Sequence, residues 1–372
     1  MTIVNRLVTP VGLLALVFVS LSLSNQAVAQ STANRRVEYV YAVNQDSNTI
    51  STFRRIGTGL LMPLQTPGLS TGSAPTTVAV NPSGTFAYVA NVVSNDLSGY
   101  SINPDGSLSS LAASFPAGSG AGWVTIDPTG RFLYVANCAA LCSGAGQGNV
   151  SGYSINKSTG ALVPVPGSPF TAEQIPYAIA IDPTGSFAYV ANYSSGSVSV
   201  FKIDQTTGSL VSLGQGVPTG GFGSLYLSLD PQGRFLYVVN TQSDNVAAFA
   251  IGSNGLLTAV PGSPFPTADF TQGVAVNSSG DFVYISAGFQ ILGFAIGASG
   301  DLTPLPDSPF PAPSFLVSLT TDHSGHFLYG AATSAGVAGY AIDSMTGDLT
   351  PVTGSPFSTG GEAFFVTTTA GR

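Results

Sequence analysis

Acid–base catalysis in this chain would depend on very few residues. The sequence of 372 residues contains two histidines, His323 and His326, and only 8% of its residues are charged. A histidine can act as a general acid or base, or as a metal ligand, near neutral pH. Both histidines lie inside one short repeated phrase that predicts a turn. We therefore expect them to be exposed turn residues, with a general-base or ligand role as the alternative.

Aspartates at the start of the same phrase have a structural explanation. They are Asp127, Asp182, Asp230 and Asp322. A carboxylate at the first position of a turn accepts hydrogen bonds from nearby backbone N–H groups. We assign these residues no metal role, and we expect neither a metal nor a cofactor.

A second set of candidates is mostly aromatic and suits binding rather than proton transfer. Four or five positions before the turn phrase, where an inner strand is expected to begin, bulky residues recur. They are Trp123, Tyr177, Tyr226, Gln272 and Phe364, with Glu362 close by. Aromatic rings beside a lone acid could stack on a sugar or hold an apolar peptide side chain. The alternative is that these side chains simply fill a narrowing axis.

The two cysteines form a third candidate site. Cys138 and Cys142 are separated by three residues within one insertion. In an oxidising compartment this spacing predicts a local disulfide that closes the loop. Two free thiols are the alternative, and a metal site is disfavoured because no histidine or acid stands nearby.

The elements that position these residues come from an internal repeat. The phrase Asp/Asn-x-Ser/Thr-Gly-x-Phe-x-Tyr returns along the chain, and its tyrosines follow one another at steps of 45 to 55 residues. They are Tyr41, Tyr88, Tyr134, Tyr189, Tyr237, Tyr284 and Tyr329. A period of this length with strand patterning in each unit is typical of β-propeller blades.

Each unit predicts a meander of four antiparallel strands. In the third unit these are 123–127, 131–137, 149–155 and 161–165, and the phrase Asp127-Pro-Thr-Gly130 makes the type I turn after the first strand. A Gly-Ser-Pro-Phe segment then leads to the next unit. We expect its phenylalanine to pack between neighbouring blades.

The two ends of the chain predict how the ring closes. The first unit begins at its second strand, 37–44, and 363–368 reads as a first strand with nothing after it. Pairing the two would complete a blade and leave no open sheet edge. We therefore predict an all-β, seven-bladed propeller closed by its N- and C-terminal strands.

Residues 1–29 have the features of a signal peptide. Arg6 precedes an apolar stretch, and Ala27-Val28-Ala29 is a cleavage site, so the propeller domain would be 30–372. We expect an exported protein, periplasmic or extracellular, from which this segment is cleaved, with a membrane anchor as the alternative. Without Arg6, nine basic residues face eighteen acidic ones, a net charge of −9. Nucleic acid is therefore a poor partner, and we expect a monomer with no membrane span in the mature chain.

The sequence resembles the seven-bladed propeller lactonases, which include 6-phosphogluconolactonase-like and carboxymuconate-cyclase-like proteins, and the related YVTN surface propellers. The resemblance rests on the phrases DPTGRFLYVAN, VSGYSI and TGALVPV and covers 37–368. These phrases make turns and strands, so they indicate the fold more than the activity.

The resemblance also implies where catalytic residues would stand. A first histidine falls at Gly122, an arginine–histidine pair at Tyr177 and Ala178, and two glutamates at Tyr193 and near Tyr226. None of these positions carries the expected residue type.

Two functions follow. The first is a non-catalytic exported scaffold that binds a glycan or a protein at the mouth of the propeller. The alternative is a lactone hydrolase with a rearranged site, in which Glu362 is the acid placed near the mouth.

Overall fold

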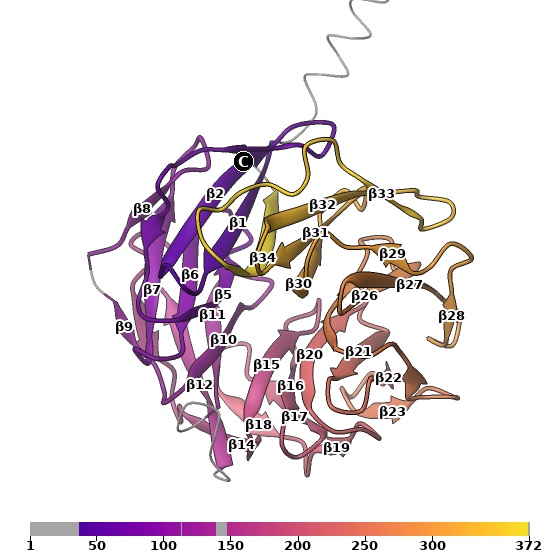
Figure 1. Ribbon diagram of the computed structural model, residues 1–372. Coiled ribbons are helices and arrows are strands. Elements are labelled where there is room, and N and C mark those ends of the chain that lie inside the picture. The colour runs from indigo at the N-terminus through magenta and orange to yellow at the C-terminus, as the bar shows by residue number, and fades with distance from the viewer. Residues whose placement is uncertain (1–36, 113, 139–146, 371–372) are drawn as a thin grey trace, which may run out of the picture. The chain divides into compact units, whose positions relative to one another are not determined.

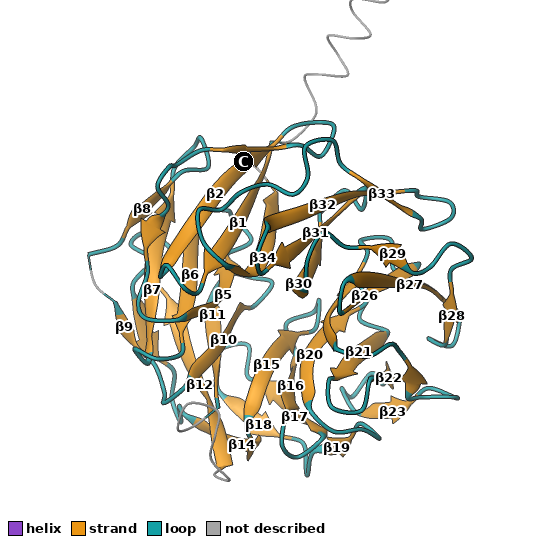
Figure 2. Ribbon diagram, in the orientation of Figure 1, coloured by secondary structure: helices purple, strands orange, loops and turns teal. Residues whose placement is uncertain are grey.

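The computed structural model describes residues 37–112, 114–138 and 147–370, and Glu38 begins one compact unit. Within these residues every regular element is a β-strand, and there is no helix (Figure 2). The strands form seven sheets that follow one another around a ring (Figure 1). The predicted all-β, seven-bladed propeller is confirmed.

Each blade has four antiparallel strands ordered from the axis outward. In blade 1 they are β34 (Ala363–Ala370), β1 (Glu38–Asn44), β2 (Thr49–Arg55) and β3 (Leu61–Pro63). In blade 2 they are β5 (Pro75–Val80), β6 (Phe86–Asn91), β7 (Asp96–Ile102) and β8 (Leu108–Ser110). In blade 3 they are β10 (Ala121–Ile126), β11 (Phe132–Asn137), β12 (Gln147–Ile155) and β13 (Leu162–Pro164).

Blade 4 comprises β15 (Pro176–Ile181), β16 (Phe187–Asn192), β17 (Ser197–Ile203) and β18 (Leu210–Ser212). Blade 5 comprises β20 (Ser224–Leu229), β21 (Phe235–Asn240), β22 (Asn245–Ile251) and β23 (Leu257–Ala259). Blade 6 comprises β25 (Thr271–Val276), β26 (Phe282–Ala287), β27 (Gln290–Ile296) and β28 (Leu302–Pro304). Blade 7 comprises β30 (Leu316–Thr321), β31 (Phe327–Ala332), β32 (Gly336–Ile342) and β33 (Leu349–Pro351).

Six blades carry a fifth, short strand that the sequence did not predict. Each pairs with the third strand of its blade, and they are β4 (Leu69–Ser70), β9 (Phe115–Pro116), β14 (Phe170–Gln174), β19 (Val217–Pro218), β24 (Phe265–Pro266) and β29 (Phe310–Pro311). The fourth strand covers only the last part of the third, as Leu210 pairs with Ile203 in blade 4. The fifth covers the first part, where Val217 pairs with Val198. The outer edge of the third strand is thus paired along more of its length.

The ring closes through the two ends of the described chain. β34 is the innermost strand of blade 1 and pairs antiparallel with β1, with Val40 opposite Thr368 and Val43 opposite Phe365. The predicted closure by N- and C-terminal strands is confirmed.

The turn phrase is held by its first side chain. The Oδ1 atom of Asp127 accepts the backbone N–H groups of Arg131 and Phe132, each at 2.7 Å. The carboxylates of Asp182, Asp230 and Asp322 accept the corresponding N–H groups in their own blades. The acids of the phrase therefore act as caps, as the sequence predicted.

The end of the phrase, Phe-x-Tyr, joins neighbouring blades. Each tyrosine is fully buried, and its hydroxyl donates a hydrogen bond of 2.7–3.1 Å to a glycine carbonyl oxygen in the outer hairpin of the next blade. The seven pairs are Tyr41–Gly106, Tyr88–Gly160, Tyr134–Gly208, Tyr189–Gly255, Tyr237–Gly300, Tyr284–Gly347 and Tyr329–Gly59. The repeat therefore encodes the contact between blades as well as the turn within each blade.

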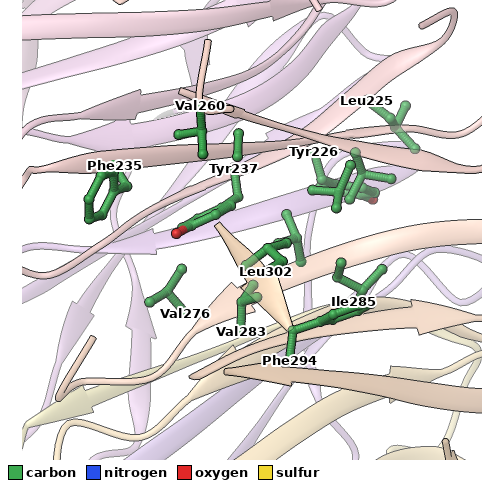
Figure 3. Close-up of a cluster of buried hydrophobic side chains, with 14 residues drawn as sticks. Leu225, Tyr226, Phe235, Tyr237, Val260, Val276, Val283, Ile285, Phe294 and Leu302 are labelled. Atoms are coloured by element: carbon green, nitrogen blue, oxygen red, sulfur yellow. The ribbon is translucent and has the colours of Figure 1, made fainter. Parts of the chain in front are cut away.

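The hydrophobic core lies between consecutive blades. Figure 3 shows one cluster, in which Tyr226, Phe235 and Tyr237 of blade 5 pack with Val283 and Ile285 of blade 6. The phenylalanines of the Gly-Ser-Pro-Phe segments and their variant join such shared clusters: Phe170 packs with residues of blades 3 and 4, Phe265 with blades 5 and 6, Phe310 with blades 6 and 7, and Phe357 with blades 7 and 1.

The ring of blades has two faces, which are named here by the parts of the strands that they carry. We call the face where the inner strands begin the mouth face, and the face with the Asp/Asn turns the turn face.

The predicted signal peptide, 1–29, lies outside the described residues. In the part of the chain that the structure covers, no helix is long and apolar enough to cross a bilayer.

Candidate functional site

Five aromatic rings form a continuous chain of contacts at the propeller axis. They run Phe365–Trp123–Tyr226–Tyr177–Tyr193, with centroid separations of 5.1, 5.3, 5.9 and 6.4 Å. The first three contacts are edge-to-face, the arrangement that aromatic quadrupoles favour. Trp123 belongs to blade 3, whereas its partners Phe365 and Tyr226 belong to blades 1 and 5. These blades are not neighbours around the propeller. The three aromatic side chains must therefore extend across the propeller axis and fill it.

A bulge at the start of the inner strands decides which side chains meet at the axis. Trp123 pairs with Ala136 and Phe365 with Val43, and in both strands the register shifts just before that pair. Tyr226 precedes Leu227, which pairs with Val238, so it has the register position of Trp123.

The remaining candidates occupy the bulged position itself. Tyr177 precedes Ala178, which pairs with Ala191, and Phe364 precedes Phe365, which pairs with Val43. Gln272 lies within the register shift of β25, between the pairs Thr271–Ala287 and Val274–Ile285. All three are half-buried. Among them, Tyr177 joins the chain of aromatic rings. The structure therefore brings together Trp123, Tyr177 and Tyr226.

Two of the five rings come from residues that the sequence analysis did not list as mouth candidates. Tyr193 follows β16 and reaches the chain from the turn of blade 4. Phe365 has the same register position as Trp123, but no turn phrase follows the last strand. The sequence analysis therefore had no reference point for choosing between Phe364 and Phe365.

Two tyrosines of the aromatic chain keep their hydroxyl protons at neutral pH. Burial raises the pKa of Tyr177 to about 12 and holds the pKa of Tyr226 well above its usual value. Both hydroxyls thus stay protonated. The amide of Gln242 donates a hydrogen bond of 3.0 Å to the Tyr193 hydroxyl, which links this end of the chain to blade 5.

A small cavity of about 180 Å³ adjoins the rings. It is lined by Trp123, Tyr226 and Phe365 and by the inner strands β20, β25 and β30. Its lining combines aromatic rings with the hydroxyl-bearing residues Ser228 and Ser318.

Glu362 lies elsewhere on the mouth face. It is exposed and lines an open pocket of about 500 Å³ between blades 7 and 1, together with Asp46 and the hydroxyl-bearing residues Thr333, Ser334, Ser358 and Thr359. Its backbone N–H donates a 2.7 Å hydrogen bond to Oδ1 of Asp46. This pocket places two carboxylates among polar groups, apart from the aromatic chain.

The histidines lie at the turn face. His323 and His326 are exposed in the turn of blade 7, as predicted. The Nδ1 atom of His323 is 3.9 Å from Oε1 of Glu38, whose other oxygen is 2.8 Å from Nε of Arg55. Neither histidine is near the aromatic chain, so the imidazoles and the mouth do not form one site.

The predicted disulfide stays a prediction. Cys138 is buried directly after β11, and Cys142 lies outside the described residues. Within the described residues, no group of three or more histidines, cysteines or acids is arranged to hold a metal ion.

Comparison with known proteins identifies the family. The model of the seven-bladed β-propeller lactonases matches residues 67–225 and 219–367. The chain belongs to this lactonase family. No curated protein matches the sequence.

Solved structures resemble this lactonase-family propeller in fold. A proposed 6-phosphogluconolactonase from Bacteroides uniformis is 20% identical, with a TM-score of 0.75, and the alignment covers 90% of this chain and 99% of the other. A periplasmic gluconolactonase from Pseudomonas aeruginosa is 17% identical, with a TM-score of 0.73 and the same coverage. Hydrazine synthase from Kuenenia stuttgartiensis is also similar, at 17% identity and a TM-score of 0.62, covering 82% of this chain and 92% of the other. The fold is thus shared by proteins of different names, and it does not define an activity.

Three of the positions that the family resemblance assigns to catalytic groups meet in space. Tyr177, Tyr193 and Tyr226 are three consecutive members of the aromatic chain. In this lactonase-family propeller they place aromatic rings where an arginine and two glutamates were expected.

Proposed function

We propose that this lactonase-family propeller is an exported, non-catalytic scaffold that binds a glycan or protein ligand on its mouth face. The observation that carries the proposal is the chain Phe365–Trp123–Tyr226–Tyr177–Tyr193. Three of its members, Tyr177, Tyr193 and Tyr226, stand at positions that the family resemblance assigns to catalytic residues.

The chemistry of these residues supports binding over hydrolysis. Opening a lactone requires a group that takes up and returns a proton and a group that stabilises the developing oxyanion. A tyrosine whose pKa is about 12, such as Tyr177, holds its proton at neutral pH. The two histidines, which could exchange protons, lie in the turn of blade 7 on the opposite face.

A lactone hydrolase remains a second candidate because of the pocket between blades 7 and 1. Asp46 and Glu362 line it together. A carboxylate there could activate water, while the second could polarise a hydroxyl.

The export that we propose rests on the predicted signal peptide, 1–29, and on the predicted disulfide between Cys138 and Cys142.

An assay on gluconolactone and related lactones separates the two functions. We expect the rate with the purified protein to equal the rate of spontaneous hydrolysis. Turnover that Glu362→Gln abolishes and Asp281→Asn preserves would overturn the proposal, since Asp281 is exposed at the turn face. Binding can be followed by fluorescence, because Trp123 is the single tryptophan of the chain and lies within the aromatic chain.

A further inference from the structure

The mouth face of blade 6 carries an open pocket of about 460 Å³ that is separate from the axis. It lies between the segment leading into β25 and the turn that joins β26 to β27. Two of its lining side chains are phenylalanines, Phe270 and Phe289, which are 68% and 70% exposed. Large exposed apolar side chains that gather around a hollow are typical of an interaction site.

The pocket exists because blade 6 has a shortened turn. Ala287 pairs directly with Gln290, so two residues connect β26 to β27. Four residues make the same connection in blades 1, 2, 4 and 5, where Asn44 pairs with Thr49, Asn91 with Asp96, Asn192 with Ser197 and Asn240 with Asn245. The missing residues leave a hollow on blade 6, and Phe289 stands at the tip of the short turn.

The backbone holds Phe270 at the rim of this hollow. Its carbonyl oxygen accepts the N–H of Gly288 at 3.2 Å, and the N–H of Thr271 donates to Oδ1 of Asp244 at 3.3 Å. Phe270 has a φ of +64°. The same position before the inner strand has positive φ in four other blades, where it is Ala74, Gly120, Ile175 or Gly223.

The phenyl ring of Phe270 contributes little to the stability of the fold. A left-handed conformation is unfavourable for a bulky residue, and glycine or alanine serves at three of the equivalent positions. Ile175 at the fourth is buried, whereas Phe270 is exposed. Since the ring neither eases the backbone nor fills the core, its presence points to a ligand.

The polar groups around the rings restrict the ligand. Asp269 and Gln290 line the same pocket. A carboxylate accepts hydrogen bonds and repels anions, and the chain as a whole carries a net charge of −8. The fitting ligand has an apolar face for the phenyl rings and hydroxyl or ammonium donors at its edge.

A pyranose ring has this combination of surfaces. We propose that Phe270 and Phe289 form a stacking site for a sugar unit of a neutral or amino-substituted glycan, with Asp269 and Gln290 bonding its edge. This inference rests on the proposed binding function and names the ligand class of a site on blade 6.

Oligosaccharide binding by the whole protein tests the site. The probes are chitohexaose and laminarihexaose, with hexagalacturonate as the anionic comparator, each measured by calorimetry. We expect binding of a neutral probe and none of the anionic one. Phe289→Ala and Phe270→Asn should each weaken binding by at least about tenfold. Asparagine tolerates positive φ, so the second variant removes the ring while keeping the backbone conformation.

Phe222→Ala provides a matched control. Phe222 is 70% exposed in the segment before β20 and does not line the pocket. It should bind like the wild type, and all three variants should keep the wild-type melting temperature within a few degrees. Failure of every sugar to bind the wild type would overturn the inference, as would equal binding by all variants or capture of a protein through Phe289.

These outcomes are separable from failure of the proposed function. Sugar binding that survives both pocket substitutions leaves the scaffold function standing and excludes the blade 6 site. Lactone turnover through Glu362 would instead refute the scaffold function.

Discussion

The hydroxyl of Tyr329 in blade 7 donates a 2.8 Å hydrogen bond to the carbonyl oxygen of Gly59 in blade 1. Gly59 also packs against Phe327, the other aromatic residue of the same phrase, which a Cβ at Gly59 would approach to 2.4 Å. The same arrangement recurs where Gly160 meets Phe86 and Tyr88. In both places the phenylalanine and the tyrosine of the phrase contact the same glycine of the next blade.

Two substitutions of one of these tyrosines distinguish the contribution of its packing from that of its hydrogen bond. Tyr189 is fully buried, and its hydroxyl donates to Gly255 at 3.1 Å. We expect Tyr189→Ala to lower the free energy of unfolding by about 3–5 kcal/mol through lost packing. Tyr189→Phe should cost only about 1 kcal/mol, for the hydrogen bond alone. Urea unfolding measures both, and unchanged stability of the alanine variant would contradict the inter-blade role.

The glycine of the contact is constrained twice. Gly59→Ala would place a methyl group against Phe327 and Val352 in a backbone conformation with a φ of +84°. Gly360 has a similar φ of +77° and no atom within 4 Å of its Cβ position. Gly360→Ala therefore reports the conformational cost, about 1–2 kcal/mol. Gly59→Ala should lower the melting temperature clearly further, and equal shifts would exclude the steric contribution.

Arg55 neutralises two buried carboxylates where blade 1 meets blade 7. Its guanidinium is 2.8 Å from Glu38 and 3.6 Å from Asp322, and it lies 5.1 Å from the centroid of the Phe327 ring. The three side chains are at most 11% exposed. Arg55→Met should destabilise the fold by about 3–5 kcal/mol, because two buried acids lose their partner. The neighbouring Arg54 is exposed, so Arg54→Met should change the unfolding free energy little.

Glu38 gives this joint a dependence on pH. Desolvation raises its pKa, which Arg55 opposes, and Asp322 adds to the rise. The folded state therefore holds its proton more tightly than the unfolded state. The resulting contribution to stability is present below about pH 4.5 and is lost as pH rises through the folded pKa. Urea unfolding at a series of pH values should show this loss of stability in the wild type, and Glu38→Gln should abolish it.

His323 acts in the opposite sense and must be measured separately. Although its side chain is 55% exposed, partial desolvation of the ring lowers its pKa, and Asp322 partly offsets the change. Its contribution is therefore present above about pH 6.5 and is lost as pH falls through the folded pKa. We expect the free energy of unfolding of His323→Asn to vary less with pH in this range than that of the wild type. An identical dependence on pH would contradict this assignment.

The sequence predicted the fold well because its repeat carries three pieces of information in eight residues. The Asp or Asn makes the turn, the glycine completes it, and Phe-x-Tyr meets the next blade. Short strands such as β19, of two residues, lie below any periodicity that a sequence can display. Their pairing depends on how much of the third strand the fourth leaves open.

The candidate site was only partly predictable. Alternation along a strand assigns Trp123 and Tyr177 to faces, but a bulge in each inner strand changes which residue reaches the axis. The contact of Trp123 with both Phe365 and Tyr226 depends on the diameter of the ring, which no local pattern specifies. The pocket of blade 6 arises from two missing residues, and a deletion is visible only once the blades are superimposed in register.

Pairing of β34 with β1 also sets the order in which the ring can be assembled. Six blades consist of strands made in succession, so each can form as its own residues are synthesised. Blade 1 is different, because its innermost strand, β34, follows all the other described strands along the chain. Until then the inner edge of β1 has free backbone groups that another chain could occupy. The first blade therefore stays incomplete until β34 has been synthesised, and the nascent chain is most exposed to mispairing at β1 just before then.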